Sequence, residues 1–83
     1  TQLNTQFFWK RTHEVDVVLI DRKRLIPLEV KYKDEIRKSE LKGLRKFMEE
    51  FRTEGIVATK SLEKKERKIQ YIPVWKLLLQ KVI

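Results

Sequence analysis

The apolar residues change their spacing near Ser39, and this change limits the chain to a fold that combines strands with helices. Residues 25–33 alternate between two sets of side chains, as in a β-strand with two different faces. Beyond Ser39 the apolar residues follow helical spacing and form one stripe: Leu41, Leu44, Phe47, Met48 and Phe51. We therefore expect an α/β fold built on a mixed sheet.

The elements are expected in the order strand, strand, strand, helix, strand, strand, helix. In chain order the strands cover residues 7–11, 14–21, 25–33, 56–59 and 68–72, with a charged loop over residues 62–68. Ser39 is the expected N-cap of the first helix, although Asp34 offers an earlier start, and Gly55 is its expected C-terminal stop. Because a helix separates residues 56–59 from the preceding strand, these two strands are expected to be parallel through a right-handed crossover.

Residues 74–83 are expected to form a second helix with a broad apolar face. Trp75, Leu78, Leu79 and Val82 lie on one side, and Val74 and Leu77 widen it. Such a face must pack on the sheet or on a partner, so this helix is also a candidate contact for a homo-oligomer.

Composition places the chain among small basic domains. Its 83 residues suffice for one domain (residues 1–83), and the absence of cysteine excludes disulfides and thiolate metal sites and fits a reducing cytoplasm. The apolar runs, such as residues 17–20 and 77–79, are too short to span a bilayer, so no membrane partner is expected. A net charge of +8 favours nucleic-acid phosphates as partners, with an ordinary basic surface as the alternative.

Strand pairing brings two acidic residues together. A hairpin with Arg22 and Lys23 at its tip places Asp16 directly opposite Glu29, and a four-residue tip keeps this register, whereas a tip of odd length shifts it. The two Cβ atoms would then lie about 4.5–5.5 Å apart, and opposed like charges destabilise a sheet unless a cation compensates. A hard cation such as Mg²⁺ supplies that compensation through carboxylates and water.

Lys31 completes this candidate site. It lies two residues beyond Glu29 on the same face, about 7 Å along the strand, where it could position an attacking water or stabilise charge on a phosphate. In the same register Glu14 falls opposite Lys31. The alternative is that Glu14, Asp16, Glu29 and Lys31 form an exposed charged face with ordinary cross-strand ion pairs, and the short Asp…Glu-x-Lys pattern does not separate the two interpretations.

Other residues near the hairpin are candidates for contact with nucleic acid. His13 either touches substrate or is a polar residue near a strand start, and Lys60 either contacts phosphate or is a solvated strand end. Lys33 and Glu14 are grouped with them as nucleic-acid contacts. Trp9 and Tyr32 either stack on bases or fill the core.

A basic stretch near the C-terminus has two interpretations. Lys64, Lys65, Arg67 and Lys68 could bind phosphate, but the interleaved Glu63 and Glu66 favour an ordinary solvated surface. No Gly-rich phosphate-binding loop is found in the sequence, so the chain is not itself expected to bind ATP.

Residues 14–18 (Glu-Val-Asp-Val-Val) and 27–33 (Pro-Leu-Glu-Val-Lys-Tyr-Lys), with the helix and strand that follow, resemble the core of the PD-(D/E)xK nuclease superfamily. More closely, the chain resembles the C-terminal domain of unknown function attached to archaeal AAA+-type ATPases. The matching segments are Phe8-Trp9, residues 14–16, 29–33, 41–44, 55–60 and 72–75, so the resemblance extends over most of the chain.

This resemblance implies a restriction-endonuclease-like fold, with a mixed central sheet flanked by helices. It also implies Mg²⁺- or Mn²⁺-dependent endonuclease cleavage of DNA. Asp16 and Glu29 would be the metal ligands, the Val30 carbonyl would complete the first shell, and Lys31 would be the catalytic lysine. Few residues precede the first strand, so the superfamily's usual first helix either lies upstream of this fragment or is absent.

The resemblance further implies a C-terminal fragment of a longer cytoplasmic ATPase, with DNA and the upstream ATPase domain as partners. The alternative is a non-catalytic DNA-binding or protein-docking module of that ATPase.

Overall fold

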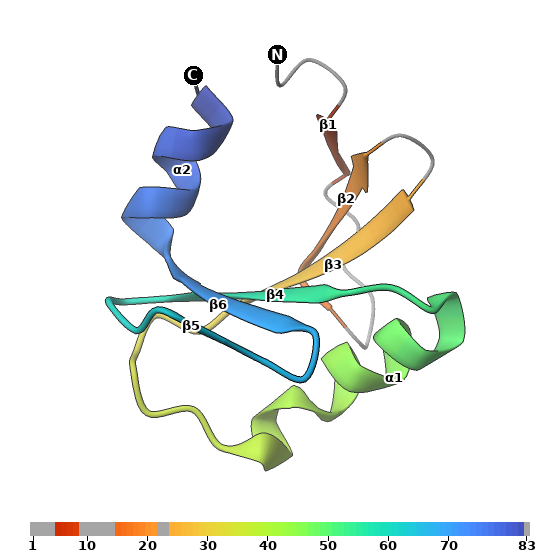
Figure 1. Ribbon diagram of the computed structural model, residues 1–83, viewed down its shortest axis with the longest axis horizontal. Coiled ribbons are helices and arrows are strands. Elements are labelled where there is room, and N and C mark those ends of the chain that lie inside the picture. Colours follow the sequence, from red (N-terminus) through yellow and green to blue (C-terminus); the bar gives the residue numbers. More distant parts are fainter. Residues whose placement is uncertain (1–4, 9–14, 22–23, 83) are drawn as a thin grey trace.

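One sheet with a helix on each face accounts for the residues that the computed structural model describes, which are 5–8, 15–21 and 24–82 (Figure 1). The elements are β1 (Thr5–Phe8), β2 (Val17–Asp21), β3 (Arg24–Val30), the 3₁₀ helix η2 (Lys38–Leu41), α1 (Lys42–Phe51), β4 (Gly55–Thr59), β5 (Lys64–Glu66), β6 (Ile69–Pro73) and α2 (Val74–Val82). The sheet order is β1-β2-β3-β4-β6-β5, with parallel and antiparallel pairs. The expected α/β class with a mixed sheet is confirmed.

Each face of the sheet has its own apolar cluster. Neighbouring residues of a strand belong to opposite clusters, as Val57 and Ala58 do in β4. The cluster under α1 includes Val18, Leu41, Leu44, Phe47, Met48, Val57, Ile69 and Tyr71, and the cluster under α2 includes Val17, Leu19, Leu28, Ala58, Ile72 and Leu77. Leu28 of β3 belongs to the cluster under α2, so the residues directly before and after it point to the opposite face, under α1. The candidate site lies on that α1 face.

The β2–β3 hairpin has the register that pairing arithmetic predicts. Asp21 pairs with Arg24 and Val17 with Leu28. β3 ends at Val30 rather than at residue 33, because the Lys33 N–H turns back to the Lys31 carbonyl (2.6 Å) in a tight turn. β1 begins at Thr5, two residues before the expected strand, while residues 9–14, which include Trp9, His13 and Glu14, lie outside the described residues.

The expected parallel pairing of β3 with β4 is confirmed, and β6 also lies parallel to β4. The expected loop over residues 62–68 is wrong in part, because Lys64–Glu66 forms β5 and pairs with β6. Arg67 and Lys68 make the turn, both with positive φ (51° and 68°) as a primed hairpin turn requires. Such turns usually contain Asn or Gly, so the sequence carried no signal for this hairpin.

Ser39 is not the N-cap of the first helix, and Asp34 does not begin it. Arg37 is the N-cap of η2, and its N–H donates to the Glu40 carboxylate (3.1 Å). Asp34 instead accepts hydrogen bonds from the backbone of Ser61 and Leu62 (2.6 and 2.7 Å). Its short side chain thus fixes the loop after β4 rather than a helix end.

Gly55 is not the helix stop. Arg52 takes the left-handed conformation that ends α1 (φ 51°, ψ 54°), and the Thr53 N–H bonds to the Met48 carbonyl (3.0 Å), as in a Schellman motif. Gly55 begins β4 with an ordinary φ, and a Cβ there would lie 2.7 Å from Met48 Sδ. Glycine is needed because α1 packs closely on this strand.

The C-terminal helix buries a different side from the one expected. Leu77 is buried and Val74 half-buried against the sheet, whereas Trp75, Leu78 and Leu79 are 54–59% exposed. The apolar positions of α2 surround most of the helix, so spacing did not identify the side that contacts the sheet. Among the described residues no helix is long and apolar enough to cross a membrane.

Candidate functional site

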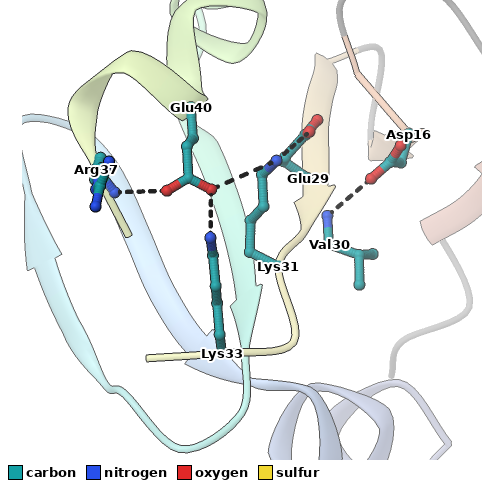
Figure 2. A network of polar contacts seen from close by, with 7 residues as sticks. All are labelled: Asp16, Glu29, Val30, Lys31, Lys33, Arg37 and Glu40. Atoms are coloured by element: carbon teal, nitrogen blue, oxygen red, sulfur yellow. Dashed lines mark hydrogen bonds and ion pairs between the residues drawn. The ribbon is translucent and has the colours of Figure 1, made fainter. Parts of the chain in front are cut away.

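The candidate site lies where β2 and β3 stop pairing. Asp16 directly precedes β2, and its Oδ2 accepts a hydrogen bond from the Val30 N–H (3.0 Å; Figure 2). The Glu29 carboxylate lies close enough to Asp16 for the Asp16 charge to raise its pKa, in addition to the larger effect of burial. The structure therefore brings Asp16 and Glu29 together at the end of the hairpin, as the predicted register requires.

Glu29 holds its charge in an unfavourable environment. Its pKa is raised above the ordinary value, first because burial removes the carboxyl from water and second because the negative charge of Asp16 is close. Lys31 offsets part of this effect, with its Nζ 3.6 Å from Glu29 Oε2. The two carboxylates and the one ammonium group have a net negative charge, which a further cation would balance.

Lys31 lies between two carboxylates rather than beside one. Figure 2 shows its ammonium between Glu29 and Glu40, 4.0 Å from Glu40 Oε1. The same Glu40 oxygen is 2.7 Å from Lys33 Nζ, and this hydrogen bond is the largest cause of the lowered pKa of Glu40. Glu40 thus anchors both lysines that follow Glu29 in the chain.

Glu40 is the residue of this site that sequence reasoning missed. The available signal was a Glu three residues after a helix N-cap, the pattern of a capping box. With Ser39 as the expected cap, Glu40 is an ordinary first-turn residue, and its spacing from Ser39 is not that of a capping box. With Arg37 as the cap, the Glu40 carboxylate points back toward the end of β3.

The oxygen donors at the site fit a small hard cation. Asp16 uses one carboxylate oxygen for the Val30 amide, and its other oxygen accepts no hydrogen bond from the residues that the structure describes. The Lys31 N–H bonds to Ala58 on β4, so strand geometry turns the N–H and carbonyl of Val30 toward Asp16. Within the described ranges, no group of three or more Asp, Glu, His or Cys side chains is arranged so that these side chains alone could hold a metal ion. A cation here would therefore depend on Asp16, Glu29, the Val30 carbonyl and water.

A cleft of about 700 Å³ adjoins this group. Tyr32, Lys33, Arg37, Glu40 and Lys60 are among its lining residues, so two of the predicted nucleic-acid contacts, Lys33 and Lys60, lie in one place. Tyr32 is 69% exposed and does not fill the core. The other two predicted contacts, His13 and Glu14, lie outside the described residues.

Asp34 explains why Lys60 reaches this cleft. Its carboxylate binds the backbone of Ser61 and Leu62, and the Lys60 N–H donates to the Lys33 carbonyl (3.3 Å). These bonds hold the segments after β3 and β4 side by side. The pKa of Asp34 is lowered chiefly by its hydrogen bonds to Ser61.

Comparison with known proteins gives one result. The model of a domain of unknown function, DUF4143, matches residues 1–77, and this domain is associated with the C-terminal regions of AAA ATPases. No curated protein and no solved structure was found to match the chain. Because the match covers almost the whole chain, the protein belongs to the DUF4143 family.

Proposed function

We propose that this chain is a divalent-metal-dependent phosphodiesterase domain of the restriction-endonuclease-like type, acting on DNA and attached to an archaeal ATPase. One observation carries the proposal: Asp16 and Glu29 meet at the end of the hairpin, with Lys31 on the same face. An arrangement that serves stability alone would separate the two carboxylates, because the charge of Asp16 raises the cost of charging Glu29.

Each residue has a separate task in this proposal. Asp16 and Glu29 bind Mg²⁺ or Mn²⁺ together with the Val30 carbonyl. A bound cation lowers the pKa of its water and polarises the phosphate. Lys31 stabilises the negative charge that develops on the phosphoryl oxygens, and Glu40 positions the lysine, with its Oε1 4.0 Å from Lys31 Nζ.

Calorimetric titration with Mn²⁺ tests the metal site directly. We expect Asp16→Ala to weaken binding by about tenfold or more, because it removes a ligand and leaves the Val30 amide unpaired. Glu35→Gln is the matched control, since Glu35 is an exposed acidic residue of the neighbouring cleft. Equal affinity in the wild type and Asp16→Ala would contradict the metal site.

Cleavage is tested separately on branched, single-stranded and duplex DNA with Mg²⁺ or Mn²⁺. The expected result is product formation by the wild type and none above background by Asp16→Ala or Lys31→Met. If the wild type cleaves no better than Asp16→Ala, the enzymatic proposal fails for this chain.

The cleft beside the site supports a second candidate, a non-catalytic DNA-binding module. An exposed aromatic ring, Tyr32, lines it together with three basic residues (Lys33, Arg37 and Lys60) and three acidic residues (Asp34, Glu35 and Glu40). This function predicts salt-sensitive DNA binding that is unchanged in Asp16→Ala and Glu29→Ala. It also predicts no dependence of that binding on divalent metal.

A further inference from the structure

A second cleft, of about 500 Å³, lies at the far end of α1 from Glu40. Its lining includes Arg45 from the first half of α1, Arg52 directly after the helix, and Arg67 and Lys68 from the β5–β6 turn. The turn is held in place by the Gly55 N–H, which donates to the Lys68 carbonyl (3.0 Å). Two segments distant in the sequence thus contribute cations to one hollow.

The positive charge of this cleft is poorly compensated. Glu49 is the one acidic residue among its lining residues, against four cationic ones. Within the described part of the chain, no ion pair within 4.0 Å involves Arg52, Arg67 or Lys68. The buried Nε of Arg45 has no hydrogen-bond partner there either. An anion in the cleft would pair with the exposed cations of Arg52, Arg67 and Lys68.

Backbone conformation adds an independent observation. Three non-glycine residues in the described ranges have positive φ, namely Arg52, Arg67 and Lys68, and all three line this cleft. The left-handed region favours Gly or Asn, so a helix end and a hairpin turn built only for stability would contain those residues. Each position instead contains a cation, although the conformation makes a long side chain costly.

We propose that this cleft binds the phosphates of a nucleic-acid backbone. Guanidinium groups bind phosphate oxygens through paired hydrogen bonds, and the net charge of +8 favours a polyanion. The ten residues of α1, about 15 Å long, run between Glu40 and Arg52, so the turn side of the cleft is remote from the candidate metal site. The inference shares the nucleic-acid partner of the proposed function, but it requires neither metal nor cleavage.

Two variants test it without threatening the fold. Arg52→Gly and the double variant Arg67→Asn/Lys68→Gly remove the cations and install residues suited to the same backbone conformations. Both are expected to raise the Tm. Both are also expected to weaken binding of a fluorescein-labelled 20-base-pair duplex, measured by anisotropy in EDTA. The double variant should lose about tenfold or more in affinity at 0.1 M salt, and the slope of log K against log salt should fall by about 2.

The matched control is Lys42→Gln/Lys65→Gln. It removes two exposed cations that line neither cleft, and it should change affinity by less than about twofold. Unchanged duplex binding by the stabilised double variant, or an equal loss in the control, would overturn the proposal. So would binding of anionic phospholipid vesicles without binding of the duplex.

A parallel Mn²⁺ titration of Arg67→Asn/Lys68→Gly separates this cleft from the metal site. That variant should bind Mn²⁺ as the wild type does, because neither residue belongs to the proposed metal site. A failure of the phosphodiesterase proposal and a failure of the phosphate cleft therefore give different results.

Discussion

Glu29 shows the conflict between stability and function at a single residue. Its carboxylate is 16% exposed and has the charge of Asp16 nearby, so folding favours its protonated form. The energetic penalty is absent below the ordinary pKa of the group and grows as the pH rises through the raised value in the folded protein. A cation at the site would remove it.

Glu29→Gln is therefore expected to stabilise the metal-free protein at neutral pH, by roughly 0.2–1 kcal/mol, the range for opposed side chains on a sheet. The gain should disappear as the pH falls below 4.5, where the carboxyl is protonated in both states. Urea unfolding between pH 4 and 8 measures this, with Glu35→Gln as the control for loss of one exposed charge.

At saturating Mg²⁺ the wild type should be more stable than Glu29→Gln, because the bound cation stabilises the wild type by mass action and the variant much less. If Glu29→Gln destabilises the metal-free protein at neutral pH, the ion pair with Lys31 outweighs the repulsion from Asp16.

The residues of the site were predictable to the extent that strand period and register determine them. Asp16, Glu29 and Lys31 followed from an even hairpin tip, because a period of two fixes which side chains share a face. Glu40 did not follow, since its position depends on which residue caps the helix. Sequence shows several possible caps, and only the packed structure selects Arg37.

Among the elements, α1 and β4 show how closely the layers approach. Gly55 is buried beneath Met48 and Leu44, and a Cβ at residue 55 would meet Leu44 Cδ1 at 3.2 Å as well as the Met48 sulfur. The Met48 side chain is itself buried, so its displacement would disturb the cluster under α1.

Gly55→Ala is accordingly expected to destabilise the protein by about 1–3 kcal/mol through overpacking. In a Met48→Ala background the same change should cost much less, because the shorter side chain leaves room for the new methyl group. A double-mutant cycle on urea midpoints gives the coupling energy. Equal costs in both backgrounds would show that the close contact with Met48 is not the cause.

Turns and helix faces were less predictable than strands and helices. β5 was missed because its turn is Arg-Lys rather than Asn-Gly, and the helix stop was misplaced because Arg52, not Gly55, takes the left-handed conformation. For α2, Leu77 contacts the sheet while Leu78 does not, a choice that depends on where β6 directs the helix. These features are decided by tertiary contacts that local preference does not contain.

For the whole molecule, two clefts lie toward opposite ends of α1, and the one at its C-terminal end has an excess of cations. The placement of β6 between β4 and β5 brings the cationic turn to α1, and neither composition nor strand count predicted that order. The first cleft is lined by three basic and three acidic residues and the second by four basic residues and one acidic residue, so the excess of positive charge lies in the cleft remote from the candidate metal site.

If one duplex contacts both clefts at once, the loss of duplex affinity in a combined variant can be predicted from the separate variants. Lys60→Gln in the first cleft and Arg67→Asn/Lys68→Gly in the second should each weaken duplex binding in EDTA. Their effects should add as free energies when combined, because the sites are distant and do not share contacts. Anisotropy titrations of the three variants measure this. The opposite result is a combined variant that binds the duplex with the same affinity as whichever of the two separate variants binds it more weakly. That result would show that the two clefts bind the duplex in alternative orientations rather than simultaneously.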